Sequence, residues 1–78
     1  MLIHILGMGC AKCEKLEERT RQAAEELKLD YQIEKIKDLQ RIMAFGVMIT
    51  PALVVDGVVK VAGKVPGVEE IKKILAKQ

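Results

Sequence analysis

The stretch Gly7–Cys13, which reads GMGCAKC, places two cysteines between segments of different hydrophobic period. Residues 2–6, which read LIHIL, form a short apolar run that is typical of a buried strand. From Ala11 to Leu27 the apolar residues recur at helical spacing, and charged residues occupy the other face. The sequence therefore predicts a strand, a loop that carries Cys10, and an amphipathic helix of about four turns with Cys13 near its start.

The placement of these cysteines favours thiol chemistry. The free amides and the positive dipole end of a helix stabilise a thiolate, which is the reactive form of cysteine. Cys10 stands at the start of the helix and gains most, while Cys13 lies one turn further along, near the core-facing side. Lys12 adds a positive charge that also favours a thiolate. The pattern predicts an exposed nucleophile, Cys10, and a shielded resolving thiol, Cys13, and it disfavours two cysteines that merely fill the core.

The middle of the chain predicts a strand followed by a short helix. Apolar and polar residues alternate over residues 31–36, which is typical of a half-exposed strand near a sheet edge. Asp38 is a suitable N-cap for a helix over residues 39–45. We expect Met43 and Met48 to fill the core, because methionine adapts to irregular gaps.

The last third predicts a hairpin and a final helix. Residues 52–55 and 58–61 are two apolar, mostly β-branched runs around Asp56-Gly57, a dipeptide typical of a two-residue hairpin turn. Residues 68–75 have helical spacing, with acidic residues early and lysines late, which matches the helix dipole.

The predicted order is therefore β-α-β-α-β-β-α in a single domain over residues 1–78. Two strands joined through a helix are expected to be parallel, with a right-handed crossover, and the hairpin makes the sheet mixed. Three helices then cover both faces of four strands. If the third strand lies antiparallel to the first, Thr50-Pro51 at its start falls near Cys10.

Four features along the chain resemble a minimal thioredoxin fold, and most of all the small glutaredoxin-like thioredoxins, the redox-active disulfide proteins of archaea and bacteria. They are the Cys-x-x-Cys after the first strand, Ile49-Thr50-Pro51 before the third, the Asp56-Gly57 hairpin, and Gly63 just after it. The resemblance spans residues 2–75. It implies an α/β protein with a three-layer α/β/α thioredoxin-like fold and a four-stranded mixed sheet.

The resemblance also implies a thiol–disulfide oxidoreductase. In that family the first cysteine attacks a substrate disulfide, the second resolves the mixed disulfide, and a cis proline shapes the peptide groove. These roles fall on Cys10, Cys13 and Pro51, and Gly63 lets a substrate backbone come close. The substrate-binding residues implied in this way are Met8, Gly9, Ala11, Lys12, Thr50, Pro51 and Gly63.

The implied redox group is the Cys10–Cys13 disulfide itself, with no metal or organic cofactor. The implied partners are proteins that contain disulfides and a thioredoxin reductase or a similar electron donor. The chain departs from thioredoxin itself in its Ala-Lys dipeptide and in having no Trp before Cys10. The resemblance therefore leaves the electron donor and the direction of the reaction open.

A soft-metal chaperone is the alternative hypothesis. Gly7–Cys13 also looks like the Gly-Met-x-Cys-x-x-Cys loop of heavy-metal-binding domains, and two thiolates with a nearby thioether suit Cu(I). That fold runs β-α-β-β-α-β and ends in a strand, whereas this chain is predicted to end in a helix. The order of elements therefore favours the redox hypothesis. An interaction domain that uses no thiol chemistry is a third alternative.

The composition of the chain limits the classes of partner that we expect. The 78 residues carry 13 basic and 11 acidic side chains, a net charge of +2 that is too balanced to indicate nucleic acid or an anionic membrane. No apolar run is long enough to span a membrane, and the N-terminus does not resemble a signal peptide. We therefore expect a cytoplasmic monomer. His4 is expected to be a partly buried strand residue rather than a ligand.

Overall fold

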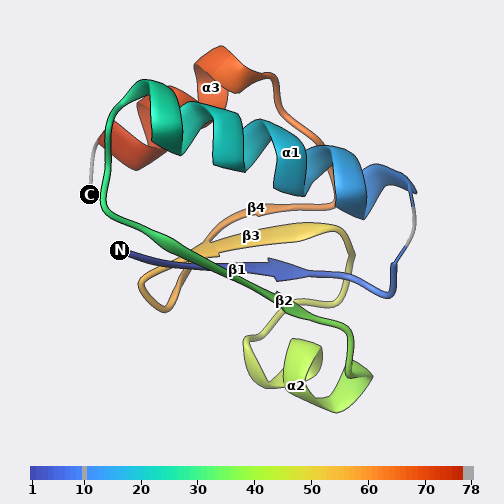
Figure 1. The fold of residues 1–78 in the computed structure, drawn as a ribbon. Helices are drawn as coiled ribbons and strands as arrows, with labels where there is room; N and C mark the ends of the chain where they lie inside the picture. Colours follow the sequence, from blue (N-terminus) through green and yellow to red (C-terminus); the bar gives the residue numbers. More distant parts are fainter. Residues whose placement is uncertain (10, 77–78) are drawn as a thin grey trace.

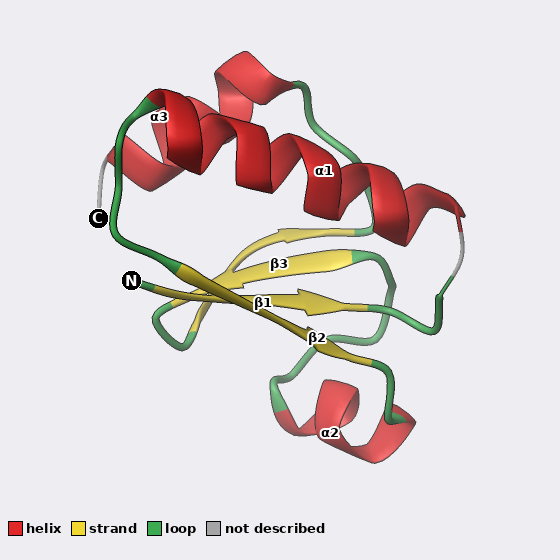
Figure 2. Ribbon diagram, viewed as in Figure 1, coloured by secondary structure: helices red, strands yellow, loops and turns green. Residues whose placement is uncertain are grey.

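A computed structural model describes residues 1–9 and 11–76, and these residues form one four-stranded sheet with three helices (Figures 1 and 2). The elements in chain order are β1 (Leu2–Leu6), α1 (Ala11–Glu26), β2 (Gln32–Ile36), α2 (Leu39–Ala44), β3 (Ala52–Val55), β4 (Val58–Ala62) and α3 (Val68–Ala76). This confirms the predicted α/β class, element order and mixed sheet. It differs from the order that the metal-chaperone alternative requires, because a helix follows β2 and another follows the last strand.

The strands lie in the order β2-β1-β3-β4. β1 pairs in parallel with β2 and antiparallel with β3, and β3 pairs antiparallel with β4. β2 is therefore an edge strand, as its alternating pattern predicted. Leu6, the last residue of β1, is paired with Ile36 on one side and with Ala52 on the other. The loop that leaves β1 consequently starts next to the first residue of β3.

The hairpin between β3 and β4 has the predicted turn. Asp56 and Gly57 both have positive φ, 49° and 85°, as a type I′ turn requires. Asp56 also binds the start of β1, because its Oδ1 accepts the Leu2 N–H at 2.8 Å and its own N–H donates to the Leu2 carbonyl at 2.8 Å. The turn thus helps to fix the register of β3 against β1.

The short helix α2 begins and ends where the sequence predicts. Asp38 caps its N-terminus, since the Asp38 carboxylate accepts the Gln40 N–H at 3.1 Å. Gly46, with φ of 83°, ends it after Phe45. Ile42 is the buried residue of this helix and joins the core on the face of the sheet that α2 covers.

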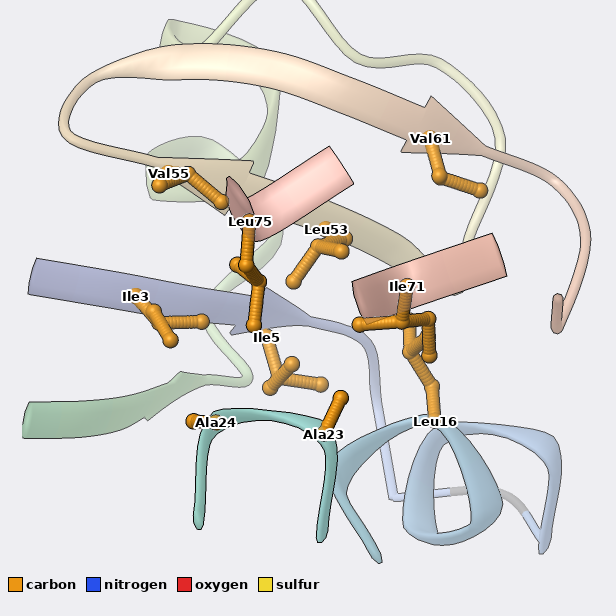
Figure 3. Close-up of a cluster of buried hydrophobic side chains, with 10 residues drawn as sticks. All are labelled: Ile3, Ile5, Leu16, Ala23, Ala24, Leu53, Val55, Val61, Ile71 and Leu75. Carbon is orange, nitrogen blue, oxygen red and sulfur yellow. The ribbon is translucent and has the colours of Figure 1, made fainter. Parts of the chain in front are cut away.

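The sheet divides the core into two clusters. α1 and α3 cover one face and α2 lies on the other (Figure 1). The cluster beneath α1 and α3 contains Ile3, Ile5, Leu16, Ala23, Ala24, Leu53, Val55, Val61, Ile71 and Leu75 (Figure 3). The cluster on the α2 face contains Leu6, Ile36, Ile42, Val47, Ala52 and Val54. All four residues of β3 are buried, so this strand contributes side chains to both clusters.

The prediction that Met43 and Met48 fill the core is wrong. Met43 is 57% exposed and Met48 is 91% exposed. α2 has only six residues and turns Ile42 inward, and Val47 takes the core position beside Met48. Leu2, at the start of β1, is also 39% exposed rather than buried.

No helix within residues 1–9 and 11–76 combines the length and the apolar character needed to cross a membrane. The longest helix, α1, has 16 residues and carries charged side chains along its outer face.

Leu53→Ala tests the dependence of the fold on the central strand. Leu53 is fully buried between β1 and the two covering helices, so we expect a loss of about 2–5 kcal/mol in the free energy of unfolding. Val58→Ala, on the exposed edge strand, is the matched control and is expected to change it by about 0.5 kcal/mol or less. Denaturant unfolding measures both, and equal losses would contradict this assignment of the core.

Candidate active site

The candidate site lies at the end of β1, where the chain passes from the sheet into α1. The Gly7 N–H donates to the Ile36 carbonyl at 3.0 Å, which holds the start of the loop against β2. Gly9 has φ of 88°, a conformation that favours glycine, and α1 begins at Ala11. Cys10, the predicted nucleophile, lies between these two residues in the chain and outside the described residues.

Cys13 lies in the first turn of α1 and is buried, with 6% of its surface exposed. Its side chain packs on the backbone of Gly7 so closely that a Cβ at Gly7 would overlap the Cys13 sulfur. Such a Cβ would also lie 3.1 Å from the Cys13 Cβ. The absence of a side chain at residue 7 is therefore what lets this thiol lie against the end of β1.

Pro51 completes the same corner of the fold. The Thr50–Pro51 peptide bond is cis, Pro51 is buried and Thr50 is exposed. The Pro51 Cα lies 4.0 Å from the position that a Gly7 Cβ would take. The end of β1, the first turn of α1 and the residue before β3 thus meet around Gly7, as the predicted pairing of the first and third strands requires.

Gly63, just after β4, is joined to this corner by a hydrogen bond. Its N–H donates to the Pro51 carbonyl at 2.8 Å, and its φ of 81° favours glycine. A Cβ at Gly63 would lie 2.8 Å from the Ile49 Cγ2. In this structure the space in front of Gly63 is therefore occupied by Ile49, a residue that is itself 62% exposed.

A cavity of about 60 Å³ adjoins Cys13. It is lined by Ile5, Gly7, Gly9, Cys13, Glu14, Lys35 and Lys37. Its volume is enough to admit water, which needs roughly 10–15 Å³. Lys35 also pairs with Glu17 at 3.4 Å. The cavity beside Cys13 is therefore lined by charges of both signs, from Lys35 and Lys37 and from Glu14.

A shallow apolar groove of about 160 Å³ lies on the α2 side of the site. It is lined by Met8, Leu39, Ile42, Met43, Val47, Met48 and Thr50. Met8, next to Gly9, is 67% exposed, and Leu39 is 52% exposed. The methionines that the sequence assigned to the core therefore form part of a surface that reaches the residue preceding Pro51.

Five of the predicted substrate-binding residues line three different depressions of the surface. Gly9 lines the cavity at Cys13, while Met8 and Thr50 line the apolar groove. Lys12 and Gly63 line a third depression, on the α3 side of α1. Ala11 is the exposed first residue of α1.

Sequence reasoning missed the residues that approach Cys13 from outside the motif. The sequence marks Gly7 as the end of an apolar run and the first residue of the Gly7–Cys13 loop, but it does not predict a contact with the Cys13 sulfur. It marks Lys35 and Lys37 only as polar residues of an edge strand and its exit. His4 is partly buried, as predicted, with its ring 5.3 Å from that of Phe45. Glu14 follows Cys13 directly, but helical periodicity assigns it to the solvated face.

Comparison with known proteins agrees with this geometry. The family model described as a thioredoxin domain matches residues 1–76. The chain is 47% identical over 76 residues to a thioredoxin of Methanothermobacter thermautotrophicus, covering 97% of this chain and 99% of that protein. It is 43% identical over 75 residues to a thioredoxin of Methanocaldococcus jannaschii, covering 96% of this chain and 86% of that protein.

Gly7→Ala tests the contact between residue 7 and Cys13. The added Cβ has no room beside the sulfur, so we expect a loss of about 1–3 kcal/mol in the free energy of unfolding. The loss should be smaller in a Cys13→Ala background, because the sulfur is then absent, and denaturant unfolding of the two single variants and the double variant measures this coupling.

Gly67→Ala is the control, since no atom lies within 4 Å of a Cβ at that position. Its effect is expected to be the same with and without the Cys13 sulfur. An equal loss for Gly7→Ala in both backgrounds would contradict the proposed contact.

Proposed function

This chain belongs to the thioredoxin domain family, and we propose that it is a thiol–disulfide oxidoreductase whose reactive pair is Cys10 and Cys13. The observation that carries the proposal is the position of Cys13, which is buried in the first turn of α1 against Gly7 and close to Pro51. A buried second thiol beside a helix start suits a resolving cysteine, which must be shielded from solution until a mixed disulfide forms.

In the reducing direction the Cys10 thiolate attacks one sulfur of a substrate disulfide. That bond breaks, the other substrate sulfur leaves as a thiolate, and a mixed disulfide joins Cys10 to the substrate. The Cys13 thiolate then attacks the Cys10 sulfur and releases the second substrate sulfur. Two electrons pass to the substrate, each released thiolate takes a proton, and the protein is left with a Cys10–Cys13 disulfide.

The cavity beside Cys13 supports the second step. Cys13 must lose its proton before it attacks, and burial alone disfavours a thiolate. The cavity admits water to the thiol, and the ammonium groups of Lys35 and Lys37 stabilise the negative charge that develops there. Glu14 lines the same cavity as these two lysines.

The apolar groove supports a protein substrate rather than a small disulfide. A groove lined by methionine and leucine side chains accepts varied apolar side chains, because methionine is flexible and polarisable. It ends at Thr50, next to Pro51, and so offers contact to residues that flank a substrate cysteine. We propose that Met8, Thr50 and Pro51 hold an extended substrate segment across the site.

The dithiol is proposed to be the only redox group, so neither a metal nor an organic cofactor takes part. A reductase or a small dithiol must return two electrons to the Cys10–Cys13 disulfide after each turnover. Both relatives are named thioredoxin, which supports partners of these two general kinds, disulfide proteins and an electron donor. A monomer in the cytoplasm is the setting we propose.

Two serine variants test this function. Cys10→Ser is expected to abolish the reduction of an insulin-type disulfide, because the attacking thiolate is lost. Cys13→Ser should also stop turnover but accumulate a mixed disulfide, because the resolving thiol is lost. Turnover is followed spectroscopically and the adduct by intact-protein mass spectrometry.

The chain provides its own control, because it contains only two cysteines. An adduct on the Cys13→Ser variant can form only at Cys10, and an adduct on the Cys10→Ser variant only at Cys13. Unfolding curves of both variants that match the wild type would exclude a folding defect. Trapping by Cys10→Ser but not by Cys13→Ser would reverse the assigned roles, and a wild type inactive with every donor would refute the function.

A further inference from the structure

The third depression at the site is a cationic cleft, defined here by the residues that line it: Lys12, Lys15, Arg19, Gly63, Lys64 and Val65. Its volume is about 400 Å³, and it lies between the first half of α1 and the segment that leads from β4 to α3. Figure 1 shows that segment passing close to the first turns of α1. Four of the six residues that line the cleft are basic and none is acidic.

The positive charges of this cleft are not neutralised within the described residues. Across residues 1–9 and 11–76, the ion pairs of basic side chains involve Arg21, Lys35, Arg41 and Lys72. The cleft cations are absent from these pairs, although the chain as a whole has a net charge of only +2. The local excess of charge therefore comes from how the fold sorts the helix residues and not from composition.

Hydrogen bonds hold the Arg19 side chain in place at one side of the cleft. Its Nη1 donates to the carbonyls of Val65 and Pro66, both at 3.3 Å, which ties α1 to the segment before α3. Carbonyl oxygens orient a guanidinium without cancelling its charge, and three of its five N–H donors remain for a ligand. The other basic residues of the cleft are exposed: Lys12, Lys15 and Lys64.

Two residues that line the cleft are linked to the candidate active site. Lys12 stands between the two cysteines in sequence. Gly63 lines the cleft and donates to the Pro51 carbonyl at 2.8 Å. Pro51 follows Thr50, which lines the apolar groove, so the two depressions lie on either side of this residue pair.

We propose that the cationic cleft binds an acidic segment of the partner protein, close in sequence to the disulfide that this chain exchanges. The inference rests on the proposed function and adds a substrate class to it. From Lys12 to Arg19 the helix rises about 10 Å, which an extended chain covers with roughly three residues. Three helix cations over that length, with Lys64 on the facing segment, match several adjacent carboxylates better than the two carboxylates of a small thiol such as glutathione.

The test uses oxidised peptides that share one disulfide loop and differ only in three flanking residues: acidic, amide or basic. Reduced wild-type protein is mixed with each peptide in a single turnover, and the products are quenched and separated. At low salt we expect the acidic peptide to be reduced about ten times faster than the basic one, because steering by opposite charge raises the association rate. High salt should remove most of the difference.

The variant pair K15Q/K64Q tests the location of the effect. It removes two cleft charges and is expected to slow the acidic peptide about fivefold, with little change for the amide peptide. K60Q/K73Q removes two exposed lysines outside the cleft and is the matched control, which should leave the acidic peptide nearly unchanged. Equal slowing by both pairs would mean that net charge alone matters, and this would overturn the proposal.

Two further outcomes also decide against it. Equal rates for all three peptides would overturn the proposal while leaving the oxidoreductase function intact. Glutathione disulfide could instead be reduced faster than every peptide, and K15Q/K64Q could slow only that reaction. This result would assign the cleft to a small anion.

A binding assay keeps the proposal testable if no peptide is reduced and the proposed function fails. A labelled acidic peptide without cysteine should bind the wild type more tightly than K15Q/K64Q, measured by fluorescence anisotropy. Equal affinities would overturn the cleft independently of redox activity.

Discussion

Leu6 is hydrogen-bonded into the sheet between Ile36 and Ala52, and this register determines what lies around Cys13. The last residue of β1 stands opposite the first residue of β3, so the loop toward α1 and the loop that carries Pro51 leave the sheet at the same place. A shift of one residue would turn every side chain of β1 to the opposite face. Ile3 and Ile5 would then leave the cluster beneath α1 and α3, so the core and the site depend on the same pairing.

Cys13 can pack against the end of β1 because Gly7 has no side chain. The Cys13 sulfur occupies the volume that a Gly7 Cβ would take, and the Cys13 side chain is buried there. The small cavity beside Cys13 is lined by Gly7 as well, together with Ile5, Gly9 and three charged residues, Glu14, Lys35 and Lys37.

The sequence predicts those parts of the fold whose causes are local. The Asp56-Gly57 turn, the Asp38 cap and the helical period from Ala11 each depend on a few neighbouring residues, and each is found where expected. The exposure of Met43 and Met48 was not predictable in this way, because it depends on which residue of a six-residue helix reaches the sheet.

For the site, the sequence points to the cysteines and to Pro51, since motif spacing marks them. It does not point to Lys37 or Lys64, and it does not predict the contact of Gly7 with Cys13, because these neighbours depend on how separate segments of the chain meet in space. The predicted role of Cys10 stays a prediction, because that residue lies outside the described part of the chain. The Cys13 surroundings, by contrast, give a specific structural reason why one of two adjacent thiols is shielded.

The apolar groove and the cationic cleft differ in the physical interaction by which each is proposed to select a partner. The apolar groove acts only after contact, because burial of apolar surface has no long range, and flexible methionines make it tolerant of shape. The cationic cleft acts before contact, over roughly 8–10 Å at moderate salt, and it repels partners of the same sign. An apolar groove that tolerates many side-chain shapes, beside a cleft that selects by charge, would let one small site accept many substrate sequences and still reject basic ones. A chain of nearly balanced charge thus has one locally basic surface, and three of its four basic residues lie on α1, the helix that carries Cys13.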